Sequence, residues 1–299
     1  MTFLDAADRP AGSAGRRFRA LVDRGGLMAL PGAYNGLAAL QAKHAGFEAL
    51  YLSGAAMSAS LGLPDLGILT VDDVASFIRQ VARAGLPLLV DADTGYGEAL
   101  NVMATVARFE AEGAAAIHLE DQQLPKKCGH LNDKRLVSPA EMAAKVTAAA
   151  RARRDLYVIA RTDAAASEGL DAAVDRSLRY LDAGADAIFP EALTTRAQFE
   201  DFARRVPAPL LANMTEFGRT PHFTADEFAA MGYRMLIWPV SALRVAAKAH
   251  ETLYATLRER GTAEGLLGQM QTRTELYATI DYAGYEALDA TIVQSTPPA

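Results

Sequence analysis

Residues 86–97 read LPLLVDADTGYG, a stretch in which an apolar run ends in two aspartates and two glycines. The apolar residues follow one another instead of alternating with polar ones, which is typical of a strand buried on both faces of a parallel sheet. Similar runs recur at spacings of ~20–40 residues, about the length of one strand plus one helix. Eight runs are present in all, and they begin near Leu27, Ala49, Leu86, Ala115, Leu156, Ala185, Ala208 and Arg234.

The segments between these runs have the periodicity of amphipathic helices, as in NVMATVARFEAEG at residues 101–113. Several of them end in a glycine, which adopts the left-handed backbone of a helix C-terminus at little cost. Eight strand-helix units predict an α/β fold, a closed (β/α)₈ TIM-type barrel that forms a single domain over residues 1–299. An open doubly wound sheet is the alternative that this pattern leaves.

The chain continues as helix-like sequence over residues 240–290, beyond the eighth run. This is more helix than the closure of a barrel requires. Two interpretations remain for these additional C-terminal helices. They form either an extra layer on their own barrel or an arm that docks on a neighbouring subunit and is exchanged with it. We favour the arm, and therefore an oligomer.

The composition narrows the classes of partner and compartment. The formal net charge is −6, and no long basic block is present, which argues against nucleic acid as a partner. We find no signal peptide and no apolar run long enough to cross a membrane. The single cysteine cannot form an internal disulfide, so nothing requires an oxidising compartment. We therefore expect a cytoplasmic enzyme with no membrane contact.

Polar residues gather where the predicted strands end. Barrel enzymes place their active sites at the carboxyl ends of the strands, where the following loops begin. Six of the eight ends carry such residues, and their convergence is the strongest sign of an active site that the residues give by themselves. They are Ser53 and Gly54, Asp91 and Asp93, Glu120 and Asp121, Arg161 and Asp163, Glu191, and Asn213 with Thr215 and Glu216.

Asp91 and Asp93 point to a metal ion. Residues two apart face the same side of an extended chain, and two carboxylates cannot both be charged at close range without a cation. Mg²⁺ binds one or two carboxylates together with water and substrate oxygens, and Mn²⁺ is the alternative. Glu120 could add a third carboxylate through water. The competing interpretation is a turn with helix-capping aspartates.

The motif KKCGH at residues 126–130 follows the fourth run and contains the only cysteine, Cys128. A lone cysteine is commonly buried and inert. Here the neighbouring cationic side chains would lower the pKa of the thiol, and a glycine gives a substrate room to approach. Because no base and oxyanion hole are evident, proton transfer is the better role than nucleophilic attack. The other candidates in this motif are Lys126, Lys127, Gly129 and His130.

Arg161 is the best candidate for binding a carboxylate, because it lies at a strand end and its guanidinium can make two parallel hydrogen bonds. Arg244 and Arg273 in the C-terminal helices are further candidates, and a surface ion pair is the alternative for each arginine. Asn213 and Thr215 could donate to carboxylate oxygens or cap the next helix. A metal, an arginine and neutral donors suit a small di- or tricarboxylate.

Two residues near the predicted site are ambiguous. Tyr51 precedes Ser53 by two residues and could act as an acid or base in the same pocket. His118 lies inside the fourth run, where a hydrogen-bonded core histidine is the better interpretation.

The motifs taken together resemble the isocitrate lyase and phosphoenolpyruvate mutase superfamily. They are YLSGAAMSASLGLPD, DADTGYG, IHLEDQ, KKCGH, ARTDA, FPEALT and NMTEFG. The length and the tail MQTRTELYATIDYAGYE are most similar to the bacterial 2-methylisocitrate lyases, and the resemblance spans Leu27 to Tyr285. KKCGH is its most specific element, because the lyase branch carries it and the mutase branch does not.

This resemblance implies a (β/α)₈ barrel, often with an exchanged C-terminal helix, in a homotetramer. Asp91 and Asp93 would hold Mg²⁺ directly or through water, and Asp65 matches another acidic position near the metal. One departure is Ala55, where those lyases have glycine, and the added methyl bears on the choice of substrate. The residues that would bind substrate are Ser53, Gly54, Ala55, Cys128, Gly129, Arg161, Glu191, Asn213, Thr215, Arg244 and Arg273.

The implied reaction is a magnesium-dependent carbon–carbon cleavage of 2-methylisocitrate to pyruvate and succinate, the step that propionate catabolism uses. Cys128 would give a proton to the carbon, and the base would be Tyr51 or a metal-bound water. The alternatives are a lyase for isocitrate or dimethylmalate, or an oxaloacetate decarboxylase or phosphonopyruvate-processing enzyme, which need no acid cysteine. A non-catalytic metabolite-binding barrel is the remote alternative.

Overall fold

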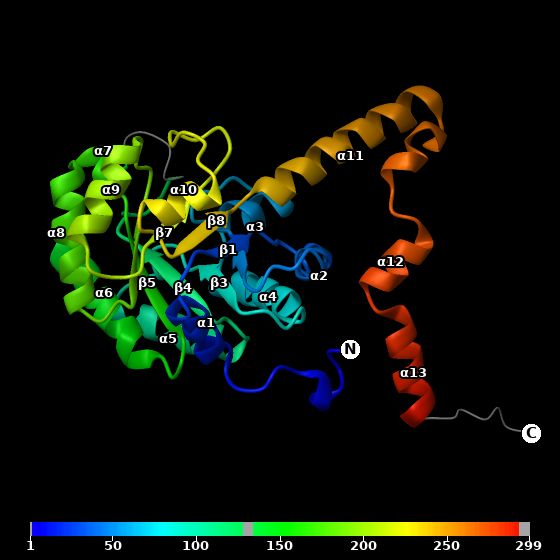
Figure 1. The fold of residues 1–299 in the computed structure, drawn as a ribbon, viewed down its shortest axis with the longest axis horizontal. Helices are drawn as coiled ribbons and strands as arrows, with labels where there is room; N and C mark the ends of the chain where they lie inside the picture. The colour runs from blue at the N-terminus through cyan, green and yellow to red at the C-terminus, as the bar shows by residue number, and fades with distance from the viewer. Residues whose placement is uncertain (1, 128–133, 293–299) are drawn as a thin grey trace, which may run out of the picture.

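The computed structural model describes residues 2–127 and 134–292. Within these ranges, eight parallel strands alternate with helices and form a ring with the helices outside it (Figure 1). Each strand lies in one of the eight predicted runs. The strands are β1 Met28–Pro31, β2 Leu50–Leu52, β3 Leu88–Asp91, β4 Ala116–Glu120, β5 Tyr157–Thr162, β6 Ala187–Pro190, β7 Leu211–Asn213 and β8 Met235–Trp238.

The strands close into a barrel through two short bridges. Regular pairing gives the orders β2-β3-β4-β5-β6 and β1-β8-β7, all parallel. A parallel bridge between Gly32 and Tyr51 joins β1 to β2, and one between Ile188 and Leu210 joins β6 to β7. The ring is therefore complete, which confirms the predicted (β/α)₈ barrel over the open sheet.

The helices begin at residues suited to capping. Thr70 accepts a hydrogen bond from the backbone of Asp73, whose carboxylate binds back to the Thr70 backbone. Ser138 caps a helix that starts with Pro139, where a missing N–H costs nothing. The helices around the barrel are α1 Ala14–Asp23, α2 Gly36–His44, α3 Gly54–Ser60, α4 Val71–Ala82, α5 Ala99–Ala111, α6 Pro139–Ala152, α7 Ala164–Ser167, α8 Leu170–Asp182, α9 Arg196–Arg205 and α10 Ala225–Ala230, with a 3₁₀ turn at Ala6–Asp8.

The core has an inner and an outer layer because strands in a barrel direct alternate side chains inward and outward. The outer layer lies between strands and helices. The inner layer fills the barrel, and at the amino ends of the strands Phe18 of α1 packs against Tyr157 with ring centroids 5.4 Å apart. That end is closed by apolar packing, so the opposite end is left for a polar pocket. The inner layer includes Met28, Leu30, Tyr51, Leu89, Ile159, Phe189, Leu211, Met235 and Ile237.

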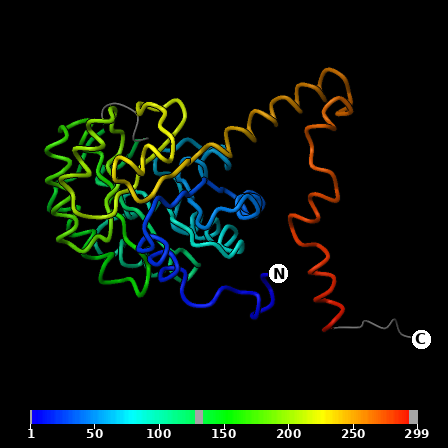
Figure 2. Tube along the Cα trace, in the orientation of Figure 1, coloured from blue at the N-terminus to red at the C-terminus, as the bar shows by residue number. Residues whose placement is uncertain are grey.

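The chain beyond β8 leaves the barrel as an extended helical arm (Figures 1 and 2). It consists of α11 Ser241–Arg260, a 3₁₀ segment Glu264–Gln269, α12 Arg273–Thr279 and α13 Tyr282–Ile292. None of the twenty residues of α11 is buried, and the structure describes all of them. The arm turns back, so that α12 contacts α2. Among the described helices, arm included, none combines the length and apolarity needed to cross a bilayer.

Replacing Gly32 with alanine should destabilise the barrel at its closure. The Gly32 amide donates to the Trp238 carbonyl at 2.9 Å, and an added Cβ would lie 2.3 Å from the Pro239 carbonyl oxygen. Because that neighbour is backbone, relief requires β1 and β8 to shift. We expect a loss of ~1–3 kcal/mol or more in the free energy of unfolding, as for other overpacked sites.

The measurement is the midpoint of thermal or urea unfolding. Gly268→Ala is the matched control, because its Cβ would meet no atom within 4 Å. Equal midpoints for the two variants would show that the barrel closure tolerates the methyl group.

Candidate active site

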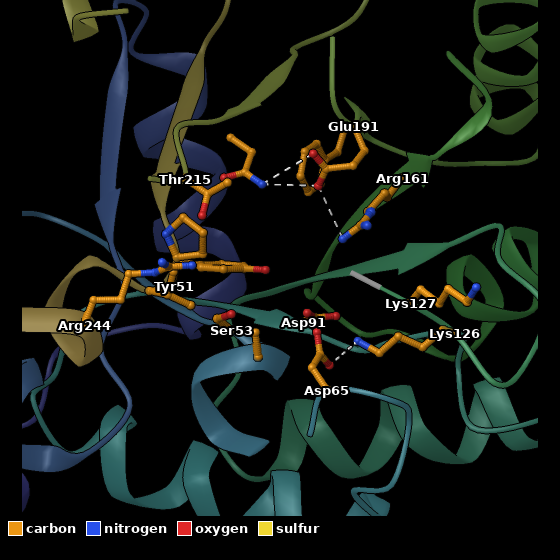
Figure 3. Close-up of a pocket in the computed structure, with 15 residues that line it drawn as sticks. Tyr51, Ser53, Asp65, Asp91, Lys126, Lys127, Arg161, Glu191, Thr215 and Arg244 are labelled. Carbon is orange, nitrogen blue, oxygen red and sulfur yellow. Dashed lines mark hydrogen bonds and ion pairs between the residues drawn. The ribbon is translucent and has the colours of Figure 1, made fainter. Parts of the chain in front are cut away.

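A pocket opens at the carboxyl ends of the strands, opposite the end that α1 closes (Figure 3). Its walls come from residues far apart in the sequence, as a barrel mouth requires. Most of the described residues that the sequence singled out lie here. The lining residues are Tyr51, Ser53, Ala55, Asp65, Asp91, Lys126, Lys127, Arg161, Phe189, Glu191, Asn213, Thr215, Pro239, Val240 and Arg244.

Asp91 is fixed at the end of β3 by two backbone groups. Its Oδ2 accepts from the Gly54 amide at 3.1 Å and its Oδ1 from the Asp93 amide at 3.0 Å. Glycine is needed at position 54, because a Cβ there would lie 2.9 Å from Asp91 Oδ2. Asp93 has a left-handed backbone with φ of 52°, so a turn, and not the extended chain that we expected, brings the two residues together.

Lys126 places its ammonium group among these carboxylates. Its Nζ lies 2.6 Å from Asp65 Oδ1 and 3.8 Å from Asp93 Oδ1 (Figure 3 shows the contact with Asp65). Burial disfavours the charged amine, but the surrounding carboxylates outweigh it and raise the pKa of Lys126 above its usual value. The acidic side of the pocket therefore carries its own counter-ion, which the sequence did not indicate.

The acidic side also has unused oxygen ligands. Asp93 Oδ1 is buried and accepts no hydrogen bond from the part of the chain that the structure describes. Burial, reinforced by Asp91 and Asp65, raises the pKa of Asp93 to about 6. No three His, Cys, Asp or Glu side chains in the described ranges converge on one point. Two carboxylates beside a solvent-accessible pocket nevertheless fit Mg²⁺, which completes its coordination with water and substrate oxygens.

Glu120 lies between this group and Arg161. Its backbone amide donates to the Asp93 carbonyl at 2.9 Å, and among the carboxylates it contributes most to the raised pKa of Lys126. Its Oε2 is 3.2 Å from Arg161 Nη1, and neither carboxyl oxygen makes a hydrogen bond with the described residues. Burial raises the pKa of Glu120 well above its usual range.

Arg161 dominates the opposite wall. Its Nε and Nη2 donate to Asp163 at 2.9 and 3.2 Å, whereas Nη1 lies 3.5 Å from Glu191 Oε2. Asn213 Nδ2 donates to the same Glu191 carboxylate at 3.2 Å, and Figure 3 shows the contact between Arg161 and Glu191. Burial opposes its charge, but Asp163 and the two glutamates raise the pKa of Arg161 well above its usual value. Arg161 therefore remains a cation inside the pocket.

Tyr51 and His118 form a buried pair beside Asp91. The Tyr51 hydroxyl lies 2.8 Å from His118 Nε2, which is 3.8 Å from Asp91 Oδ1. Burial lowers the pKa of His118 to about 4, so the imidazole is neutral, and burial together with Asp91 raises the pKa of Tyr51 well above 10. His118 is a core histidine as expected, and it also connects Tyr51 with Asp91.

Of the two arginines predicted in the C-terminal helices, the structure places one at the pocket and one away from it. Arg244, in the first turn of α11, lines the pocket, and its guanidinium lies 5.2 Å from the Phe217 ring centroid. Arg273 is an exposed residue at the start of α12, on the arm, and the structure does not bring it to this pocket. The helical pattern gave no information on where the arm turns.

Cys128, Gly129 and His130 lie outside the described residues. The residue before them, Lys127, lines the pocket. The Gln122 side chain holds its backbone by two hydrogen bonds, donating to the Lys127 carbonyl at 2.8 Å and accepting from its amide at 3.0 Å. The sequence analysis missed Gln122, whose only signal was its place directly after a strand end.

The comparisons with known proteins agree with this geometry. The family model for phosphoenolpyruvate phosphomutase matches residues 18–258. The 2-methylisocitrate lyase of Bacillus subtilis is 55% identical over 283 residues, 94% of each chain. That of Aeropyrum pernix is 50% identical over 98% of this chain and 94% of its own.

Solved structures extend the likeness to the whole fold. A 2,3-dimethylmalate lyase superposes with a TM-score of 0.89 at 36% identity, covering 94% of this chain and 96% of its own. An oxaloacetate acetylhydrolase gives 0.87 at 34% identity, covering 93% and 97%. The chain therefore belongs to the phosphoenolpyruvate mutase and isocitrate lyase superfamily and, within it, to the 2-methylisocitrate lyases.

Proposed function

We propose that this protein is a magnesium-dependent carbon–carbon lyase that cleaves 2-methylisocitrate to pyruvate and succinate. The observation that carries the proposal is the division of the pocket. Ionisable carboxylates with unused oxygens lie on one wall, and a buried arginine lies on the other. Such a pocket holds a hydroxy acid at a metal and its remaining carboxylates at the arginine. The shared sequence with lyases of that name supports the same substrate.

The acidic wall would hold the metal. Asp91 and Asp93 would be the direct or water-mediated ligands, with Asp65 nearby and Glu120 as a third carboxylate that acts through water. When bound, Mg²⁺, or Mn²⁺ in its place, would lower the pKa of the substrate hydroxyl and orient the bond to be broken. Asp91 is preorganised for this role by the amides of Gly54 and Asp93.

The other residues bind the substrate and disperse charge. Arg161 presents Nη1 to the pocket and would stabilise the doubly charged enolate of the departing succinate. Glu191 orients the Asn213 amide. Ser53, Gly54, Ala55, Thr215, Gly129 and Arg244 complete the proposed set of substrate contacts, with Arg273 depending on the position of the arm.

Two proton transfers are needed. The base for the hydroxyl proton would be Tyr51 or a water in the pocket. Burial keeps the Tyr51 hydroxyl protonated, so Tyr51 would act by passing its own proton to the neutral His118, whose Nε2 lies 2.8 Å away. Cys128 is the proposed acid that protonates the enolate carbon, with Lys126 and His130 in the same motif influencing its charge. Gln122 fixes the backbone at Lys127, which brings the start of this motif to the pocket.

A substrate panel tests the proposal. Release of pyruvate is measured from 2-methylisocitrate, isocitrate and 2,3-dimethylmalate, and loss of oxaloacetate is followed separately. Each assay is run with Mg²⁺, with excess chelator, and after Mg²⁺ or Mn²⁺ is restored. We expect the largest kcat/KM for 2-methylisocitrate, by ~10–200-fold over isocitrate, the discrimination that one methyl group provides.

A larger kcat/KM for another acid would transfer the assignment to that substrate. Ala55 lines the pocket, so Ala55→Gly run beside the wild type tests whether its methyl contributes to the choice. Activity that survives complete chelation would contradict the metal requirement. No turnover of any acid by metal-loaded protein would favour a binding barrel.

We further propose that the chain works as one barrel domain whose arm packs on another copy, in a homotetramer in the cytoplasm. The arm carries large apolar side chains that the described chain leaves uncovered, including Val245 at 72%, Tyr254 at 65% and Leu267 at 64% exposed. Sedimentation equilibrium would measure the assembly. A monomeric wild type would contradict this part of the proposal.

A further inference from the structure

We infer that Asp163 is a positioning residue that holds Arg161 with one amino group turned toward the substrate. This inference rests on the proposed function, in which Arg161 binds a substrate carboxylate. Asp163 follows β5 directly, is fully buried and is not among the residues that line the pocket. It therefore acts through Arg161 and not on the substrate.

The contacts of Arg161 are divided between two directions. Nε and Nη2 both donate to the Asp163 carboxylate, at 2.9 and 3.2 Å. This two-point contact fixes the plane of the guanidinium as well as its position. Nη1 remains on the pocket side, 3.2 Å from Glu120 and 3.5 Å from Glu191. The direction in which Nη1 points is thus set by Asp163.

Asp163 is itself held in place by contacts with Asp121 and Lys134. Its amide donates to Asp121 Oδ1 at 2.9 Å, and Lys134 Nζ lies 2.6 Å from its Oδ1. Asp121 Oδ2 in turn accepts from the Thr162 hydroxyl at 2.8 Å and from the Tyr180 hydroxyl at 2.9 Å. Hydrogen bonds therefore run without a break from α8 to the guanidinium. A carboxylate supported in this way has little freedom to move with Arg161.

Loss of the Asp163 charge would change the balance around Arg161. Glu120 and Glu191 would remain as its close carboxylates, and both lie on the Nη1 side. The guanidinium would be drawn toward them and would turn away from its present plane. A displacement of ~1 Å in a group that contacts the reacting molecule can cost ~10²-fold in rate.

The competing interpretation is that Asp163 only stabilises the fold, as any buried ion pair can when one partner is removed. Asp186 offers a matched control for that role. It precedes β6 at the opposite end of the barrel, pairs with Arg19 at 2.9 Å and with Arg153, and accepts from the Val158 amide at 2.9 Å. Asp186→Asn therefore removes a comparable set of contacts away from the pocket.

The experiment compares Asp163→Asn, Asp163→Glu and Asp186→Asn with the wild type. Thermal midpoints, kcat and KM for 2-methylisocitrate, and the affinity for succinate by calorimetry are measured well below every midpoint. We expect Asp163→Asn to lower kcat/KM by ~10²-fold and to weaken succinate binding. Asp163→Glu, which keeps the charge, should recover part of the kcat/KM and part of the succinate affinity. Asp186→Asn should lower the thermal midpoint and leave kcat/KM and succinate affinity near those of the wild type.

The outcomes separate the two claims. Wild-type kcat/KM and succinate affinity in Asp163→Asn, beside an active wild type, would overturn the inference and leave the proposed function intact. A wild type that neither cleaves 2-methylisocitrate nor binds succinate would overturn the proposed function, and the inference with it. If Asp163→Asn does not fold, Tyr180→Phe replaces it. This variant removes one hydrogen bond that holds Asp121, the residue that accepts from the Asp163 amide. A several-fold rise in KM supports the inference, and an unchanged KM overturns it.

Discussion

Asp91→Asn should lower kcat for 2-methylisocitrate by at least ~10³-fold, the equivalent of the several kcal/mol that a catalytic metal supplies. Burial opposes ionisation of this carboxyl, but the neighbouring His118, Lys126 and Arg161 outweigh it and hold the pKa of Asp91 well below its usual range. Asp91 is therefore a permanent anion on the acidic wall. Asparagine keeps its shape but removes the charge that would attract a divalent cation.

The measurement combines pyruvate release with calorimetric titration of Mg²⁺ into the metal-free protein. We expect binding to weaken along with turnover. Asp73→Asn is the matched control, because Asp73 is an exposed capping residue of α4 that contacts Thr70 and not the pocket. An Asp91→Asn variant that bound Mg²⁺ and turned over like the wild type would remove Asp91 from the metal site.

Cys128→Ser should lower kcat by ~10²–10⁴-fold, the range that general acid catalysis contributes. A serine hydroxyl is a far weaker acid than a thiol, so protonation of the enolate carbon would become slow. The affinity for Mg²⁺ and for succinate should change little, since neither depends on the thiol proton. Turnover close to that of the wild type would exclude Cys128 from proton transfer.

Chemical modification gives an independent measurement of the same role. Cys128 is the only cysteine in the sequence, so iodoacetamide modifies a single thiol. The modified wild type should lose activity to a similar or greater extent, and saturating succinate should slow the loss. Cys128→Ser should be insensitive to the reagent, which makes it the control for modification elsewhere.

The sequence predicted most of the fold because its dominant signals are local. Continuous apolar runs report burial on both faces of a strand, and the segments between them report helix periodicity. All eight strands fall within the predicted runs, and the ring closes as expected. The position of the pocket followed from the same pattern, since parallel strands in a barrel bring their carboxyl ends to one mouth.

Other features of the site arise from contacts between distant segments. Lys126 meets Asp65 across the acidic wall, and Tyr51 meets His118 across two strand pairings. Neither pair has a signature in spacing, because register between strands decides which side chains become neighbours. The left-handed turn at Asp93 is likewise a tertiary result, since non-glycine residues rarely adopt it without support.

By itself, the sequence determined that eight buried strands would form a barrel and that six of them would end in polar residues around one pocket. An arginine and an acid pair predicted to bind a metal are among these residues. Only the tertiary structure decided that Arg161 is held by Asp163, that Lys126 neutralises the acids, and that Arg273 stays on the arm. The physical reason is that burial and periodicity depend on residues close together in the sequence. The direction of a charged side chain depends instead on every charge that the folded barrel brings close to it.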